Sequence, residues 1–333
     1  MSTSRPLAVY TDADDLDPTL GIELLEAHGF RVEFLQTTDP AVIVARAQEA
    51  EALLVGYAEV SAETIAALPQ LKIIALASSG VDQVDLDAAR AHGVCVANLP
   101  ALAAEEVAGH AIALALAMLR ELPFFAGRAA EGDWLSRPPV APARIGATRL
   151  GLVGLGHIGS VAAQQAQGLF GEVVGYDPHL PETPETAARL ASLGVRRVTL
   201  EELLATSGVV SLHLPLTAET QHLIDADALA AMPAGSTLVN VSRGGLVDPD
   251  ALRDAIDRGH LRGAALDVLD VEPAPVDHPL VGHPRILLTP HVGYLSDHTL
   301  REYVRVQAQN VVSFRERGAA DHVVVAPALT PTS

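Results

Sequence analysis

Short apolar runs of strand length alternate with amphipathic helical stretches along almost the whole 333-residue chain, and this alternation constrains the fold most strongly. Such alternation is typical of parallel sheets that are covered by helices on both faces. The sequence therefore predicts two doubly wound α/β domains, which a chain of this length can support. In the first domain we expect strands at 7–10, 32–35, 52–55, 72–75 and 94–97, with helices such as 19–28 and 62–68 between them. In the second we expect strands at 149–154, 172–176, 209–212, 237–241, 263–267 and 285–289.

A long helix is predicted at residues 105–122, between the two series of strands, and it is apolar around most of its circumference. A helix of this kind must be buried, either within its own fold or against another subunit. It is followed by a proline-rich crossing at 137–142, and a last helix is predicted at 296–316. Periodicity does not decide which of the two domains this last helix joins.

Composition narrows the classes of partner. The chain has 41 acidic and 22 basic residues and a net charge of −19, so we expect it to bind neither nucleic acid nor membrane. The single cysteine, Cys95, cannot form an intrachain disulfide, and no cluster of residues predicts a metal site. Residues 1–6 lack a signal-peptide pattern, and the apolar run 107–119 is shorter than the roughly 20 residues that span a bilayer. We therefore expect a soluble, cytoplasmic protein.

The run Gly154-Leu155-Gly156-His157-Ile158-Gly159 is a G-x-G-x-x-G motif that joins a predicted strand to a predicted helix. In this context the glycines permit a tight turn, close approach to a pyrophosphate and packing of the helix on the strand. Asp177 ends the next strand, where a carboxylate binds ribose hydroxyls and repels the 2′-phosphate of NADP. We expect no arginine close to Asp177 that could bind that phosphate. The pattern predicts an NAD-binding Rossmann domain; an ordinary glycine turn with a helix-capping aspartate is the structural alternative.

Three further segments, 240–245, 267–273 and 289–294, follow predicted strands, and they carry Arg243, Glu272 and His291. Ligands of open α/β sheets bind at the carboxyl ends of strands, so these side chains can converge on the nicotinamide. Histidine, whose ordinary pKa is near 6.5, can protonate a ketone oxygen during hydride transfer. A carboxylate beside it favours the imidazolium, and a guanidinium binds a substrate carboxylate in bidentate fashion. Taken singly, each could instead be a surface arginine, a solvated acid or a structural histidine.

Together these motifs resemble those of the D-isomer-specific 2-hydroxyacid dehydrogenases. The similarity covers roughly residues 70–310. Short segments at 105–108, 277–280 and 294–296 most resemble the branch that contains the C-terminal-binding-protein corepressors and their bacterial enzyme relatives. The motifs that carry the resemblance are the glycine motif with its aspartate (154–177), His-Leu-Pro-Leu-Thr (213–217), Asn-x-Ser-Arg-Gly-Gly-x-Val-Asp (240–248), Ala-Leu-Asp-Val…Glu-Pro (265–273) and Thr-Pro-His (289–291).

The resemblance implies a homodimeric enzyme that transfers a hydride between NAD(H) and a small 2-hydroxy or 2-keto acid, such as glyoxylate or hydroxypyruvate. It implies a flavodoxin-like substrate domain (1–102 and 296–333) and a Rossmann domain (103–295). The implied catalytic residues are Arg243, Glu272 and His291, and the implied substrate-binding residues are Ser78, Ser79, Gly80, Arg243 and His291. The implied cofactor-binding residues are Gly154, Gly156, His157, Ile158, Gly159, Asp177, Leu214, Pro215, Thr220, Val241, Ser242 and Asp267.

Two positions depart from the family's pattern. Leu76 stands where many relatives have an arginine, which argues against a phosphorylated or dicarboxylic substrate, and Gly109 stands where they have Glu or Asp.

Two other functions remain open. One is an NAD-sensing scaffold, because the corepressors also retain the catalytic trio. The other is an oxidoreductase that acts on a different substrate, such as formate or phosphite.

Overall fold

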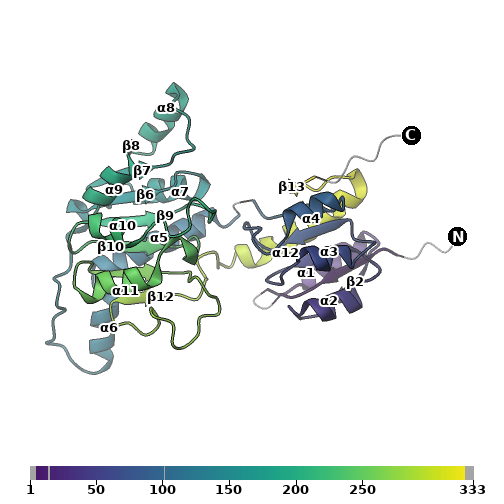
Figure 1. The fold of residues 1–333 in the computed structure, drawn as a ribbon, viewed down its shortest axis with the longest axis horizontal. Coiled ribbons are helices and arrows are strands. Elements are labelled where there is room, and N and C mark those ends of the chain that lie inside the picture. The colour runs from purple at the N-terminus through teal and green to yellow at the C-terminus, as the bar shows by residue number, and fades with distance from the viewer. Residues whose placement is uncertain (1–4, 14–15, 101, 327–333) are drawn as a thin grey trace. The chain divides into compact units, whose positions relative to one another are not determined.

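The computed structural model describes residues 5–13, 16–100 and 102–326, and the chain divides into two compact units (Figure 1). The first unit comprises Met1–Leu102 and Ser296–Ser333, and the second comprises Ala103–Leu295. Most of the N-terminal stretch that bears on a signal peptide, residues 1–4, lies outside the described residues.

The first unit contains a six-stranded sheet with the strand order β13-β5-β4-β3-β1-β2. The five strands that the sequence predicts here are all present and pair in parallel. The sixth strand, β13, pairs antiparallel with β5 and is not predicted, because it is a three-residue edge strand with two exposed valines. The strands are β1 (Leu7–Tyr10), β2 (Arg31–Phe34), β3 (Ala50–Val55), β4 (Ile73–Leu76), β5 (Cys95–Ala97) and β13 (Val323–Val325).

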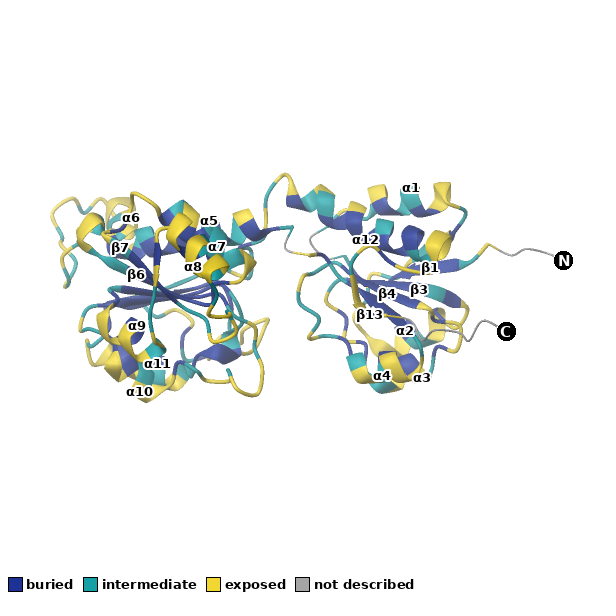
Figure 2. Ribbon diagram, turned by 90° about the horizontal axis from the view of Figure 1, so that it is seen from above, coloured by how far each residue is buried: buried dark blue, intermediate teal, exposed yellow. Residues whose placement is uncertain are grey.

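Helices cover both faces of this sheet, because successive residues of its strands are apolar on both sides (Figure 2). On one face α1 and α12 pack over Tyr10 and Ala8, and on the other α2, α3 and α4 pack over Leu7 and Val9. The placement of the last helix, which periodicity left open, is thus decided: α12 packs in the first unit. The helices are α1 (Thr19–Ala27), α2 (Pro40–Arg46), α3 (Ala62–Ala66), α4 (Leu86–Ala91) and α12 (Thr299–Arg317).

The second unit contains a seven-stranded parallel sheet with the order β12-β11-β10-β9-β6-β7-β8. All six predicted strands are present; the sequence Val-Arg-Arg of the edge strand β8 has too few apolar residues to be recognised. The strands are β6 (Arg149–Val153), β7 (Glu172–Tyr176), β8 (Val195–Arg197), β9 (Val209–Leu212), β10 (Thr237–Asn240), β11 (Gly263–Leu266) and β12 (Ile286–Leu288).

The helices of the second unit also lie on both faces of its sheet (Figure 2). Apolar side chains of α5, α7 and α8 form the core on one face, and those of α9, α10 and α11 form the core on the other. These helices are α5 (Ala104–Leu119), α7 (His157–Ala166), α8 (Pro184–Ser192), α9 (Leu200–Thr206), α10 (Ala226–Ala231) and α11 (Pro249–Asp257).

The long helix predicted at 105–122 is interrupted near its end. α5 ends at Leu119, and α6 (Leu122–Ala130) continues at an angle of 66°. Glu121 at the corner has a φ of +55°, and its carboxylate pairs with the largely buried Arg262 at 2.7 Å. α5 buries one face within its own unit, against α7 and the sheet, while Ala113 on its other side is exposed. No single helix in the described part of the chain is long and apolar enough to cross a membrane.

Candidate active site

The glycine motif forms a tight turn between β6 and α7. A Cβ atom on Gly154 (φ +96°) would collide with the carbonyl oxygen of His213, and one on Gly159 would collide with the carbonyl oxygen of Gly154. In contrast, a Cβ on Gly156 would have no described atom within 4 Å. The first and third glycines are therefore required for packing, and open space lies beside the second. α7 begins at His157, and Ile158 lies in its first turn. Because the backbone amides at a helix N-terminus bind anions, the turn and the start of α7 fit a dinucleotide pyrophosphate.

Asp177 follows β7 and lies beside this turn. Its carboxylate accepts hydrogen bonds from the backbone amides of Leu155 (2.9 Å) and His179 (2.9 Å). The expectation that no arginine lies near Asp177 is wrong, because β8 carries Arg197 to it. The Arg197 guanidinium donates to the carbonyl oxygens of Asp177 (3.3 Å) and Leu180 (2.9 Å). Only the pairing of β8 with β7 reveals this proximity, since the two residues are 20 positions apart.

The remaining predicted cofactor residues lie in loops that follow β9, β10 and β11. After β9, Thr220 Oγ1 donates to the carbonyl of Pro215 (2.8 Å), which closes the turn that begins at Leu214. After β10, Val241 is buried, and the hydroxyl of Ser242 donates to the carbonyl of Leu212 (2.7 Å). Because β9 pairs with both β6 and β10, these loops share one edge of the sheet with the glycine turn. Their contacts with a cofactor stay a prediction.

Glu272 and His291 are in direct contact. Nδ1 of His291 lies 2.7 Å from Oε2 of Glu272, and Oε1 of Glu272 accepts a hydrogen bond from the amide of Leu269 (2.8 Å). The carboxylate thereby fixes the ring, whose Nε2 faces away from Glu272. The side chains are 41% and 36% exposed for His291 and Glu272, so solvent and small molecules can reach the pair.

Arg243 lies on the loop next to this pair, where β10 ends. Nδ2 of the buried Asn240 donates to the carbonyl of Arg243 (2.8 Å), and Nη1 of Arg243 donates to the carbonyl of Ser242 (2.8 Å). At the following position, Gly244 packs so closely on the backbone of Leu269 that no side chain would fit. The arginine loop therefore abuts the loop that carries Glu272.

Asp267 has a further role that its sequence motif did not reveal. Its buried carboxylate accepts hydrogen bonds from Thr289 Oγ1 (2.5 Å) and from the amides of Val292 (3.0 Å) and Gly293 (2.7 Å). Burial raises the pKa of Asp267, but hydrogen bonds from His110, Thr289 and the two amides outweigh it, and the net pKa is below the ordinary value. The carboxylate is therefore ionised at neutral pH and holds the segment that contains His291.

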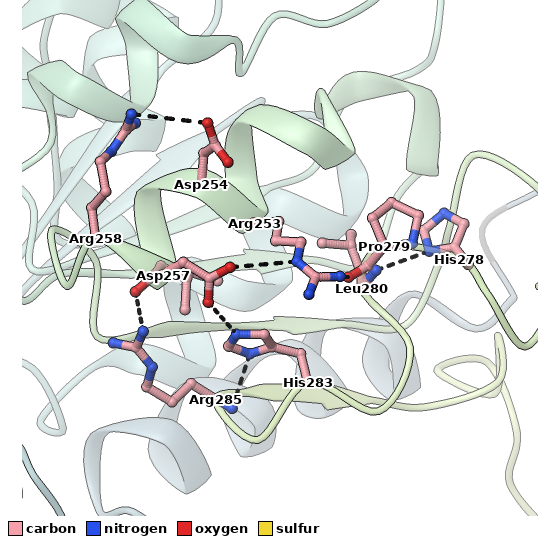
Figure 3. Close-up of polar contacts among 10 residues, drawn as sticks. Arg253, Asp254, Asp257, Arg258, His278, Pro279, Leu280, His283 and Arg285 are labelled. Atoms are coloured by element: carbon pink, nitrogen blue, oxygen red, sulfur yellow. Dashed lines mark hydrogen bonds and ion pairs between the residues drawn. The ribbon is translucent and has the colours of Figure 1, made fainter.

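The end of the long loop after Glu272 is fastened to α11 (Figure 3). Arg253 of α11 donates to the carbonyl of Pro279 (2.8 Å), and Asp257 contacts Nε2 of His283 at 3.0 Å. The hydrogen bond from His283 is the main reason that the pKa of Asp257 lies below its usual value. Within the loop, Nε2 of the buried His278 lies 2.9 Å from the Asp270 carboxylate. These contacts support the loop on both sides of Glu272.

The predicted substrate loop, Ser78 to Gly80, follows β4 in the first unit. The Ser78 hydroxyl donates to the carbonyl of Gly80 (2.7 Å), and the Ser79 hydroxyl donates to that of Leu99 (2.6 Å). Among the described residues, no partner accepts from the backbone amides of Ser79 and Gly80, which makes them available to an anion. The nearby Leu76 is fully buried in the apolar core of this unit.

A family model covers most of the second unit. Residues 112–293 match the model described as "D-isomer specific 2-hydroxyacid dehydrogenase, NAD binding domain". This range contains the glycine motif, Asp177 and the three predicted catalytic residues.

Individual proteins are similar over most of the chain. The D-3-phosphoglycerate dehydrogenase of Mycobacterium tuberculosis is 42% identical over 86% of this chain and 53% of its own length. The glyoxylate reductase of Korarchaeum cryptofilum is 34% identical over 90% of both chains. A crystal structure of D-lactate dehydrogenase from Aquifex aeolicus, complexed with NAD and lactic acid, is 27% identical, covers 96% of this chain and 99% of its own, and has a TM-score of 0.85. The chain thus spans about half the length of the phosphoglycerate dehydrogenase.

Proposed function

Since the chain belongs to the D-isomer-specific 2-hydroxyacid dehydrogenase family and NAD(H) is the cofactor of its second unit, we propose that it is a keto-acid reductase. The reaction would transfer a hydride between NAD(H) and a small 2-hydroxy or 2-keto acid, such as glyoxylate or hydroxypyruvate. The observation that carries this proposal is the contact of 2.7 Å between Glu272 and His291, at the carboxyl edge of the sheet that bears the glycine motif.

His291 is the proposed proton donor for keto-acid reduction. The Glu272 carboxylate can only accept, so the proton on Nδ1 of His291 points toward it. Nε2 then carries a second proton only in the imidazolium form. Reduction therefore uses imidazolium, which protonates the keto oxygen, and oxidation uses neutral imidazole; bound NADH would supply the hydride to the carbonyl carbon. Glu272 orients the ring.

Two other elements are proposed to bind the substrate carboxylate. The guanidinium of Arg243 can bind a carboxylate in bidentate fashion and polarise the adjacent keto oxygen. In the first unit, the backbone amides of Ser79 and Gly80 can donate to a carboxylate. The related enzymes include a phosphoglycerate dehydrogenase and a glyoxylate reductase, and the apolar, buried Leu76 favours an unphosphorylated substrate.

The enzyme is further proposed to prefer NAD(H) to NADP(H), because the Asp177 carboxylate would repel a 2′-phosphate.

We also propose a homodimer. The predicted basis for it is the apolar helix α5, which buries one face in its own unit and leaves Ala113 exposed and Leu116 and Ala117 partly exposed. Further support comes from the segment after α6, where Trp134 and Leu135 are 79% and 86% exposed.

A panel of 2-keto acids with NADH tests the reaction. Glyoxylate, hydroxypyruvate, pyruvate and phenylpyruvate are incubated with enzyme, and oxidation of NADH is followed by its absorbance. We expect turnover of at least one acid. Tight NADH binding without turnover of any acid would instead favour the NAD-sensing scaffold function. No observation in the described part of the structure supports that function.

A further inference from the structure

His110 connects helix α5 to the segment that carries His291. Its Nε2 lies 3.0 Å from Thr289 Oγ1 and 3.5 Å from Asp267 Oδ1. The side chain is only 23% exposed, and the ring also packs beside Gly293, where a Cβ would lie 3.4 Å from Cδ2 of His110. The proposed reaction assigns no role to His110.

The directions of the hydrogen bonds follow from the available protons. Thr289 Oγ1 has one proton and donates it to Asp267 at 2.5 Å, because an ionised carboxylate can only accept. Thr289 Oγ1 must then accept from His110. The proton of His110 is therefore on Nε2, and the hydrogen bonds run from His110 to Thr289 and from Thr289 to Asp267.

This chain of hydrogen bonds ends on the backbone around His291. Asp267 accepts from the amides of Val292 and Gly293, and its carbonyl oxygen accepts from the amide of His291 (2.8 Å). His291 itself has a φ of +53°, in the left-handed region. A residue other than glycine stays in such a conformation only where its surroundings hold it there.

We propose that His110 is a positioning residue for His291. Its hydrogen bond to Thr289 completes the network that keeps residues 289–293 in the conformation in which Nδ1 of His291 meets Glu272. The effect on turnover rests on the proposed reductase function, because misplacement of a proton donor by a fraction of an ångström slows a reaction. The effect on the backbone of this segment does not depend on that function.

Kinetics of His110 variants test the effect on turnover. His110→Ala should lower kcat for the preferred keto acid by about 10- to 100-fold, with an unchanged Kd for NADH. His110→Gln should recover most of the loss, because the glutamine amide can donate to Thr289 in place of Nε2. His260→Ala is the matched control: His260 is a half-buried histidine of the same unit whose Nε2 lies 3.1 Å from the carbonyl of Leu229. It should leave kcat unchanged.

Hydrogen–deuterium exchange of the full chain tests the effect on the backbone independently of activity. Amides of residues 289–295 should exchange faster in His110→Ala than in the wild type, and His260→Ala should leave their exchange unchanged. Unchanged exchange in His110→Ala overturns the proposal. So does faster exchange with unchanged kcat, or an equal loss of kcat in His260→Ala. If the wild type reduces no keto acid, the reductase function fails, but faster exchange in His110→Ala alone still supports the positioning role.

Discussion

Replacement of His291 by asparagine tests the proposed proton transfer most directly. Asparagine cannot exchange a proton at neutral pH, but like histidine it is enriched among residues in the left-handed region. His291 occupies that region with a φ of +53°. The variant should therefore keep the backbone of its loop and its thermal stability while it loses the proton donor.

The size of the effect follows from the exposure of the site. Loss of a general acid typically slows a reaction by about 10²- to 10⁴-fold, which corresponds to about 2.7–5.4 kcal/mol of activation free energy. The His291 side chain is 41% exposed, so water can reach its place and supply a proton in the variant. We therefore expect the lower half of this range, a fall in kcat of about 10²- to 10³-fold. The Kd for NADH should stay unchanged, because the glycine motif and Asp177 are intact.

The assay compares kcat, KM, the Kd for NADH and the Tm of His291→Asn with those of a matched control. His222 is exposed and has a φ of +49°, so His222→Asn makes the same substitution in the same backbone conformation. The control should keep wild-type kcat and Tm. A His291→Asn variant with near-normal kcat would refute the proton-transfer role of His291.

Three other features lead to predictions. Asp177→Ser should raise kcat/KM with NADPH relative to that with NADH, because the repelling carboxylate is lost while Arg197 remains close by. If steady-state kinetics show an unchanged cofactor preference, Asp177 is not the residue that discriminates between NADH and NADPH. Burial lowers the pKa of His213 from 6.5 to about 4, so the unfolded chain binds this proton more readily than the folded one. Above pH 6.5 His213 is neutral in both states and does not reduce the free energy of unfolding. As the pH drops from 6.5 toward 4, the free energy of unfolding should fall by about 3 kcal/mol, because only the unfolded chain binds the proton. In urea unfolding, His213→Gln should lack this decline. An equal decline in the variant and the wild type would show that His213 does not cause the pH dependence. The double variant Trp134→Ser, Leu135→Ser should shift the mass measured by light scattering from two chains to one; a monomeric wild type would rule out the dimer.

Much of the architecture could be predicted because the central strands are buried on both faces. Such strands are continuous apolar runs, and nine of the eleven predicted strands lie inside their sheets; all eleven are present. The two short edge strands, β8 and β13, were missed because exposure at an edge relaxes the need for apolar residues. The break between α5 and α6 was also missed, since it depends on a left-handed Glu121 that pairs with Arg262, 141 positions away.

The sequence by itself determined where the candidate site lies. The tight glycine turn needs residues without a Cβ, and the loops that follow parallel strands share one edge of the sheet, so local spacing was enough to propose Asp177, Glu272 and His291. The tertiary structure alone decided which side chains support them. His110 contacts Thr289 across 179 positions, and Arg197 reaches Asp177 only because β8 pairs with β7. Contacts of this kind depend on how whole elements pack, and no local pattern of residues records them.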